Sequence, residues 1–312
     1  MIDLRYKSWG DDCFELSVPA SVANLGPGFD TLAVAVQLYL HLRVRVLPGE
    51  GELYFEFVNE KLDGENYIER AFRFLANQRT GGFPSLAVEV RSDIPMKSGL
   101  GSSAAATVAG LRLFEAIAGP LPAQGLLNAA CALENHPDNV AAALLGGLTL
   151  SCQMSDRSVV AVQMEWPENL QLLVLTPRYA LSTHEARGVL PERIAREDAV
   201  FNLQHIALLL HCLQTGRFTV LREALQDRLH QPFRQSLVPG LERALGLEHP
   251  DLLGVCLSGA GPSVVAFAER NFSEVEGVLS EALQSTGIPF TLRRLRVHQG
   301  SRVPEPSPAR VS

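Results

Sequence analysis

The spacing of apolar residues changes at a glycine-rich segment near residue 100, and this change limits the possible folds more than any other feature. Apolar and polar residues alternate before it in four short segments, as they do in strands with one buried face: 14–18, 40–46, 53–57 and 86–90. Small residues and leucines then follow helical spacing from Ser102 to Ala118, where Gly119 and Pro120 end the pattern. We therefore expect a strand-rich first third that leads into a buried helix.

The second half of the chain has another order of elements. The pattern predicts strand, helices, strand, strand, helix and strand over these segments: 170–175, 193–230, 254–257, 264–267, 273–285 and 289–297. This order is typical of a ferredoxin-like split βαβ sandwich. Ser273 is expected to cap the last helix and Gly287 to close it. The predicted fold class is α+β.

The length of 312 residues favours about two domains. We place the boundary near residues 151–163, which gives an N-terminal domain over 1–155 and a C-terminal domain over 156–300. Residues 301–312 are rich in proline and have no apolar periodicity, so we expect a disordered tail there.

Composition and charge exclude several classes of protein. The chain has 27 Lys and Arg against 34 Asp and Glu, a net charge of −7, whereas a nucleic-acid binder needs a basic surface. The first residues form no apolar leader, and no apolar stretch suits a membrane span. The five cysteines form no CxxC pair, so neither a disulfide framework nor a zinc site is indicated. We expect a cytoplasmic protein with neither nucleic acid nor membrane as a partner.

The segment IPMKSGLGSSAAA, residues 94–106, has the properties of a phosphate-binding loop. Gly99 and Gly101 let backbone N–H groups converge, and the helix that opens at Ser102 adds unpaired donors and the positive end of its dipole. The lysine of a Walker A motif is absent. A dinucleotide fingerprint fits poorly, because eight residues separate Val90 from Gly99 and no strand follows the helix. A simple glycine turn is the other alternative, but two serines at the start of the helix favour phosphate.

Four motifs in this order resemble those of the GHMP small-molecule kinases: PASVANLGPGFDTL (19–32), IPMKSGLGSSAAA (94–106), ENHPDNVAAALLGG (134–147) and LSGAGPS (257–263). The strings ANLGPGFD and HPDN are similar, more narrowly, to those of the homoserine kinases. STHEAR (182–187) and HQPFR (230–234) extend the resemblance, which covers residues 13–296. It implies a two-domain α+β fold with an N-terminal S5-like α/β domain, in agreement with the sandwich order of the second half.

The resemblance implies an ATP- and Mg²⁺-dependent enzyme that phosphorylates the side-chain hydroxyl of L-homoserine in threonine biosynthesis, as a homodimer. It assigns ATP binding to the two glycine loops, with these residues: Pro95, Met96, Lys97, Ser98, Gly99, Leu100, Gly101, Ser102, Ser103, Ala104, Ala105, Gly259 and Gly261. Ser103 and Glu134 are expected to hold Mg²⁺, which prefers hard oxygen ligands.

The resemblance also implies a set of substrate-binding residues: Asn24, Asp30, His136, Asn139, Arg187 and Arg234. Asp30 suits an ammonium group and Asn24 a hydroxyl. The planar forks of Arg187 and Arg234 match a carboxylate. His136 suits helix capping or packing about as well as a substrate contact.

The identity of a general base stays open. Asn139 is in register with an aspartate of several relatives, but an amide cannot accept the proton. We infer that Asn139 orients the hydroxyl and that the proton leaves late, to phosphate or water, as a loose transition state permits. Asp138 is then interpreted as structural or as a support for the catalytic residues. Lys97 either contacts phosphate or faces water, and Asn66 and Tyr67 are candidates for the adenine pocket by position only.

Two other functions are weighed. A GHMP kinase for another small alcohol would not need Asp30, Arg187 and Arg234, which together suit a zwitterion. A non-catalytic ligand- or RNA-binding module is disfavoured by the net negative charge and by the pair of Ser103 and Glu134.

Overall fold

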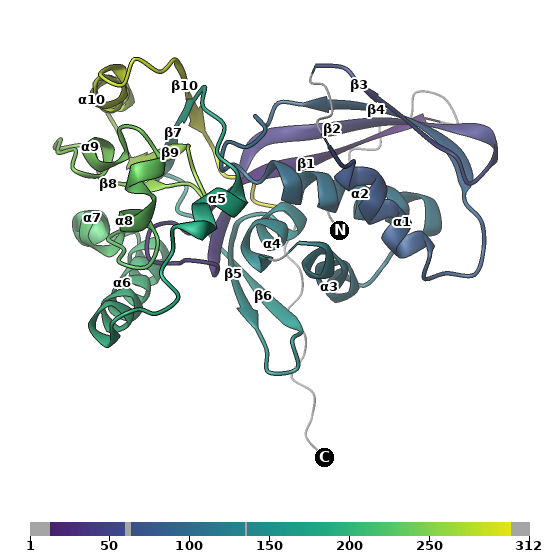
Figure 1. The fold of residues 1–312 in the computed structure, drawn as a ribbon, viewed down its shortest axis with the longest axis horizontal. Helices are drawn as coiled ribbons and strands as arrows, with labels where there is room; N and C mark the ends of the chain where they lie inside the picture. Colours follow the sequence, from purple (N-terminus) through teal and green to yellow (C-terminus); the bar gives the residue numbers. More distant parts are fainter. Residues whose placement is uncertain (1–12, 60–63, 135, 301–312) are drawn as a thin grey trace.

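A computed structural model describes residues 13–59, 64–134 and 136–300, and it arranges them in two lobes that lie side by side (Figure 1). The first lobe is a sheet covered on one face by helices. The second is a smaller antiparallel sheet with helices around it. The predicted tail at 301–312 lies outside the described residues. Within the described residues, no helix combines the length and apolarity that crossing a bilayer requires.

The first lobe contains the strands that the alternating segments predict, together with a later hairpin. They are β1 (Cys13–Ala23), β2 (Leu32–Glu50), β3 (Leu53–Phe57), β4 (Pro84–Ser92), β5 (Leu148–Gln153) and β6 (Val159–Met164). The sheet order is β3-β4-β2-β5-β6, and β1 pairs antiparallel with β2. The 19-residue β2 is the central strand, because it pairs with β1, β4 and β5.

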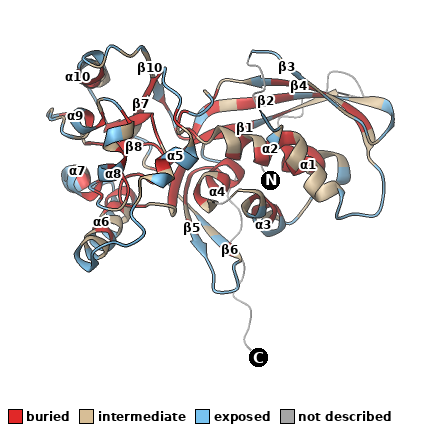
Figure 2. Ribbon diagram, viewed as in Figure 1, coloured by how far each residue is buried: buried red, intermediate tan, exposed pale blue. Residues whose placement is uncertain are grey.

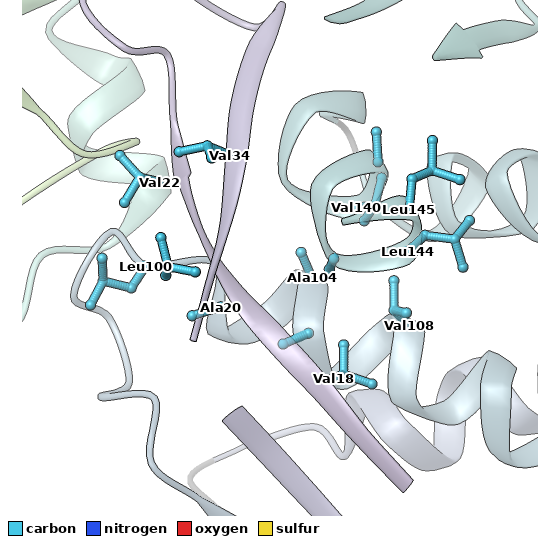
Figure 3. Close-up of a cluster of buried hydrophobic side chains, with 14 of the residues drawn as sticks. Val18, Ala20, Val22, Val34, Leu100, Ala104, Val108, Val140, Leu144 and Leu145 are labelled. Carbon is cyan, nitrogen blue, oxygen red and sulfur yellow. The ribbon is translucent and has the colours of Figure 1, made fainter. Parts of the chain in front are cut away.

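Four helices cover one face of this sheet: α1 (Tyr67–Ala76), α2 (Ser102–Ala118), α3 (Ala123–Leu133) and α4 (Pro137–Leu145). The predicted bounds of the buried helix are confirmed by α2. Its small residues let it lie close to β1 and α4, where Val18, Ala104, Val108 and Val140 form a continuous core (Figure 3). Most residues of α2 and α4 are therefore buried, whereas the β5–β6 hairpin ends in exposed residues (Figure 2).

The second lobe confirms the predicted split βαβ order. Its strands are β7 (Gln171–Pro177), β8 (Gly254–Leu257), β9 (Val264–Ala268) and β10 (Phe290–Leu295), paired antiparallel in the order β10-β7-β9-β8. The helices are α5 (Thr183–Gly188), α6 (Arg196–Thr215), α7 (Leu221–Ala224), α8 (Gln231–Arg234), α9 (Leu241–Leu245) and α10 (Phe272–Gln284), with 3₁₀ turns η1 (Phe218–Val220) and η2 (Gln235–Leu237). The first and last strands of the lobe are thus neighbours at one side of its sheet.

The start of α10 differs from the prediction. The N-cap is Asn271, which has a left-handed backbone with φ of 49°, and no side chain caps the helix. Ser273 lies within the first turn, so its predicted capping role is wrong. Starting the helix at Phe272 places the Phe272 ring against the core of the second lobe, and asparagine tolerates the left-handed backbone that this early start requires.

The first sheet extends further along the chain than the predicted boundary at residues 155 and 156. That boundary falls in the turn of the β5–β6 hairpin, and both strands of this hairpin belong to the first sheet. Residues 296–300 also return to the first lobe. The backbone N–H of Gln37 donates to the carbonyl of Arg296, and that of Gly147 donates to the carbonyl of His298. We therefore propose that the boundary between the two domains lies between Met164 and Gln171, and that the last described residues belong to the first lobe.

The packing of α1 on α2 requires a glycine and supplies a test of the core. A Cβ on Gly110 would lie 2.1 Å from the carbonyl oxygen of Ile68 and 2.9 Å from Cβ of Ala71. We expect Gly110→Ala to lower the free energy of unfolding by about 1–3 kcal/mol, because overpacking outweighs the better helix propensity of alanine. Gly277→Ala in α10 is the matched control, since a Cβ there meets open space; it should raise stability by up to about 1 kcal/mol. Urea unfolding measures both, and equal effects would contradict the close approach.

Candidate active site

A cleft of about 1110 Å³ runs between the two lobes and collects nearly all of the predicted site residues. Both glycine loops line it, as do the predicted metal-binding and substrate-binding side chains. Leu100 and Ala105 are exceptions: their side chains are buried in the hydrophobic core, 1% and 0% exposed, and do not line the cleft. These two residues therefore contribute packing beneath the loop.

The phosphate-type loop has the backbone geometry that its glycines predict. Gly99 and Gly101 have φ of 80° and 70°, which favour glycine. Gly101 is the N-cap of α2, and no side chain caps the N–H groups of the first turn. Ser98 is held inside the loop by a 2.7 Å hydrogen bond from its hydroxyl to the carbonyl of Pro95. The first turn of α2 thus presents unpaired donors in the cleft, where an anion is stabilised.

The SGAGPS loop of the second lobe packs directly on this first loop. The hydroxyl of Ser258 donates to the carbonyl of Gly99 at 2.7 Å, and the N–H of Ser263 donates to the carbonyl of Ser98 at 3.0 Å. A Cβ on Gly99 would lie 2.4 Å from the carbonyl oxygen of Ser258 and 2.8 Å from that of Gly261. The close approach of the two loops therefore excludes any side chain at Gly99.

The predicted metal-binding pair is in contact. The hydroxyl of Ser103 donates to Oε1 of Glu134 at 2.6 Å, and the hydroxyl of Thr107 donates to the same oxygen at 2.9 Å. Arg70 approaches this oxygen at 3.9 Å. Hydroxyl and carboxylate oxygens converge beside the phosphate-type loop, and this donor set fits Mg²⁺. Sequence reasoning missed Thr107, although it lies one helical turn after Ser103 and so on the same face.

The other end of the cleft holds a cluster of opposite charges. Nη2 of Arg187 donates to Oδ1 of Asp30 at 2.6 Å and lies 2.8 Å from Nδ1 of His136. Nε of Arg187 is buried and has no partner within the described residues. Burial, and next the nearby Arg187, lower the pKa of His136. This end of the cleft therefore offers one carboxylate and one partly satisfied guanidinium to a ligand that carries both charges.

Asn24 connects loops of the two lobes. Its backbone is left-handed with φ of 72°, and its side-chain amide donates to the carbonyl of Gly259 at 3.0 Å. Its Oδ1 accepts from the backbone N–H of Asp30 at 3.1 Å. Asn24 lines the cleft, and its side-chain oxygen holds the backbone of Asp30 in place.

Arg234 is almost completely buried, at 1% exposure, and its guanidinium is held from two sides. Nε donates to the carbonyl of Ala186 at 3.0 Å, and Nη1 donates to the carbonyl of Gly259 at 3.0 Å. Burial, and next the positive charge of Arg187, lower the pKa of Arg234 to about 10. The side chain stays charged at neutral pH, so an anionic ligand would offset the cost of burying it.

Asp138 and Asn139 lie at the start of α4 and line the cleft. Asp138 is 2% exposed, and its Oδ1 accepts from the backbone and side-chain N–H groups of Asn139 at 2.7 and 3.2 Å. Burial, and next the negative charge of Asp30, raise the pKa of Asp138 to about 7. Oδ1 of Asn139 accepts from the hydroxyl of Ser21 at 2.8 Å. The carboxylate is therefore poised to change protonation near neutral pH.

The remaining part of the cleft is lined by apolar side chains of the first lobe. Asn66 and Tyr67 lie here, as their positions suggested: Asn66 caps α1, and the ring of Tyr67 lies 4.6 Å from the guanidinium carbon of Arg70. Sequence reasoning missed several residues that line this region or the facing second lobe: Leu40, Phe57, Val90, Arg178, Tyr179, His184, Thr291 and Arg293. Apart from His184, which lies within STHEAR, no motif marks them, because the cleft forms only when distant strands meet.

Comparison with known proteins agrees with this geometry. The family model described as the GHMP kinases N terminal domain matches residues 66–147, and the GHMP kinases C terminal model matches residues 209–286. The chain is 40% identical over 281 residues to a homoserine kinase of Solibacter usitatus, covering 88% of this chain and 91% of that protein. It is 41% identical over 268 residues to a homoserine kinase of Deinococcus radiodurans, covering 83% and 86%.

Solved structures show the same likeness. The crystal structure of homoserine kinase from Cytophaga hutchinsonii superposes with a TM-score of 0.81 at 26% identity, covering 94% of this chain and 98% of that one. A mevalonate kinase of Methanococcus jannaschii shares the fold alone, with a TM-score of 0.71 at 14% identity over 93% of this chain and 99% of that one. With both family models matched in order and close relatives aligned over most of its length, the chain belongs to the homoserine kinases of the GHMP kinase family.

Proposed function

We propose that the enzyme transfers the γ-phosphoryl group of ATP to the side-chain hydroxyl of L-homoserine and forms O-phospho-L-homoserine, a step of threonine biosynthesis. The observation that carries the proposal is the layout of the cleft. An anion-binding loop and an oxygen pair suited to Mg²⁺ lie at one side, and opposite charges that match an amino acid lie at the other. The names of the aligned relatives support the same substrate.

The nucleotide is held by the backbone of the two glycine loops. N–H groups at the start of α2 face the triphosphate, and Gly259 and Gly261 keep the second loop close enough to cover it. Ser103 and Glu134 would hold Mg²⁺, which when bound neutralises charge on the phosphates. The apolar wall formed by Leu40, Phe57 and Val90 is our proposal for the adenine side of the cleft.

The amino-acid end of the substrate replaces an ion pair that the protein forms by itself. Asp30 and Arg187 are 2.6 Å apart, and each is about one-third exposed. A zwitterion offers an ammonium to Asp30 and a carboxylate to Arg187 and Arg234, so that both charges keep an opposite partner. An alcohol without these two charges would break the pair without replacing it. This is why we favour homoserine over the sugar or isoprenoid alcohols of other GHMP kinases.

The hydroxyl and its proton are assigned to two neighbouring residues. Asn139 is fixed by Ser21 and Asp138 and is placed to orient the hydroxyl. Sequence reasoning favoured a proton that leaves without a protein base. The burial of Asp138 and its raised pKa, about 7, instead lead us to propose this carboxylate as the proton acceptor, because a base works best when its pKa lies near the working pH. A loose transition state allows the transfer to be late.

Two further features belong to the proposal. A cytoplasmic location suits a biosynthetic enzyme whose cysteines are all free within the described part of the chain, and a homodimer is the expectation that the family resemblance gives. The alternatives, another small alcohol as substrate or a non-catalytic binding module, are tested with the same assay. ADP release is measured with homoserine, serine, threonine, mevalonate and galactose, and turnover of homoserine well above the others is the expected result.

The metal assignment predicts a specific loss. Glu134→Gln should raise the Mg²⁺ concentration needed for half-maximal activity and lower kcat about 10- to 100-fold, because a charged metal ligand is lost while the fold is kept. Titration of Mg²⁺ under saturating ATP measures this effect. Glu281→Gln, an exposed acid on α10, is the control and should behave as wild type. If the Mg²⁺ dependence of Glu134→Gln is unaltered, Glu134 is a hydrogen-bond partner of Ser103 and not a metal ligand.

If Arg234 binds the carboxylate of homoserine, its loss should affect the binding of homoserine and not that of ATP. Arg234→Leu should raise the KM for homoserine about 10- to 100-fold and leave the KM for ATP nearly unchanged, because a charge-assisted contact to the substrate carboxylate is lost. Arg294→Leu is the control, since Arg294 pairs with Glu276 on the surface. Steady-state kinetics with each substrate varied gives both constants. An equal rise of the two KM values would contradict a carboxylate site at Arg234.

The assignment of Asp138 as the proton acceptor predicts how kcat/KM depends on pH. With Asp138 as the base, kcat/KM should fall as the pH drops below about 7, because the carboxylate becomes protonated. Asp138→Asn should lower kcat by about 10²–10⁴ and remove this titration. Single-turnover rates across pH separate chemistry from product release. If Asp138→Asn keeps most of its activity while Asn139→Leu loses more, the proton leaves without a protein base and Asn139 carries the orientation.

A further inference from the structure

His230 lies beneath the amino-acid end of the cleft and connects two parts of it. The side chain is 0% exposed and precedes α8, the short helix that carries Arg234. Its Nε2 is 2.8 Å from the carbonyl oxygen of Gly26, and its Nδ1 is 3.2 Å from Nη1 of Arg234. The ring stacks on Phe29 with centroids 5.1 Å apart. His230 therefore joins the loop that carries Asp30 to the guanidinium of Arg234.

The two hydrogen bonds fix the protonation of the ring. A carbonyl oxygen only accepts, so Nε2 carries a hydrogen, and a guanidinium only donates, so Nδ1 carries none. Burial lowers the pKa of His230, and the positive charge of Arg234 lowers it further, against the opposite effect of Asp227. Oδ2 of Asp227 lies 3.5 Å from Nε2 and accepts the backbone N–H of His230. The ring is thus neutral, and its one donor and its one acceptor are both hydrogen-bonded, to Gly26 and to Arg234.

The hydrogen bond to His230 helps determine which part of Arg234 is left for a ligand. Nε donates to Ala186, and Nη1 donates to both Gly259 and His230, so within the described residues only Nη2 makes no hydrogen bond. The guanidinium is planar, and fixing two of its nitrogens fixes the direction of the third. Phe29 lies 5.3 Å from the guanidinium carbon and stacks on His230, which limits rotation of the whole group.

We infer that His230 is a positioning residue that aims Nη2 of Arg234 at the substrate carboxylate and so contributes to the preference for an amino acid. The inference rests on the proposed function, because it requires Arg234 to bind that carboxylate. His230 itself does not line the cleft, so its effect passes through Arg234. Loss of the acceptor at Nδ1 leaves Nη1 with the carbonyl of Gly259 as its remaining partner among the described residues. The guanidinium is then held less firmly, and kcat/KM falls only for substrates that carry a carboxylate.

Two variants test the two hydrogen bonds of the ring one at a time, and both lose its stacking on Phe29. His230→Gln keeps an N–H that reaches the carbonyl of Gly26 but has no acceptor beside Arg234. His230→Asn places an amide oxygen where Nδ1 lies and keeps the acceptor. Each variant is assayed with L-homoserine and with 3-aminopropan-1-ol, which has the same hydroxyl and ammonium but no carboxylate. The quantity compared is the ratio of kcat/KM for the two substrates.

We expect His230→Gln to lower this ratio about tenfold, as loss of a charge-assisted hydrogen bond would. His230→Asn should keep most of the wild-type ratio. Equal losses for both substrates in His230→Gln, or identical ratios in the two variants, would overturn the inference and leave His230 with a packing role alone.

Two further measurements keep the outcome decisive. Arg234→Leu tests the proposed function by itself: a ratio unchanged in this variant means that the carboxylate site is wrong, whatever His230 does. If His230→Gln does not fold, as judged by its unfolding midpoint, ¹⁵N NMR of the histidine-labelled wild-type enzyme replaces it. The Nδ1 resonance of His230 should move on saturation with homoserine and stay in place with 3-aminopropan-1-ol. A resonance that responds equally to both, or to neither, would overturn the inference.

Discussion

The carbonyl oxygen of Gly259 is the point on which the arrangement of the site depends. It accepts one hydrogen bond from Asn24 of the first lobe and one from Arg234 of the second, each at 3.0 Å. The N–H of Gly259 donates to the carbonyl of Ala23 at 3.0 Å. The backbone groups of one residue, Gly259, therefore connect the β1–β2 loop to the carboxylate end of the cleft. The carbonyls of Ser258 and Gly261 approach Gly99 so closely that no side chain fits there, and these two residues flank Gly259 in its loop.

Local periodicity predicts those parts of the fold that depend on neighbouring residues. The bounds of α2 and the order of β7, β8, β9, α10 and β10 follow from spacing and from glycine and proline signals. The extent of the first sheet does not, because β5 joins it by pairing with β2, more than a hundred residues earlier, and β6 joins it by pairing with β5. The return of residues 296–300 to the first lobe likewise depends on backbone contacts with Gln37 and Gly147 that no local pattern contains.

In the site, too, some residues can be found from sequence motifs and others only from the folded structure. Each of the four motifs contributes residues to the lining of the cleft, whereas other motif residues, such as Leu100, are buried in the core. Thr107 and His230 could have been found, since each lies four residues from a predicted site residue, Ser103 and Arg234, in or beside a helix. The apolar wall could not, because an apolar residue outside a motif shows its role only when the surrounding strands are in place; Phe29, by contrast, lies within the motif at 19–32.

The proposed chemistry also explains why a carboxyl group is buried where it costs stability. Asp138 has a pKa of about 7 in the folded chain against an ordinary value of 3.8, mainly because of burial. A carboxyl whose pKa is raised by folding stabilises the fold below about pH 4, and this contribution is lost as the pH rises through 7. At neutral pH the protein therefore keeps a partly ionised carboxylate in a site that disfavours the charge. A purely structural residue would gain by replacement with asparagine, which forms similar hydrogen bonds without ionising. A proton acceptor would not, because its raised pKa is what lets it take a proton from a hydroxyl and release it again.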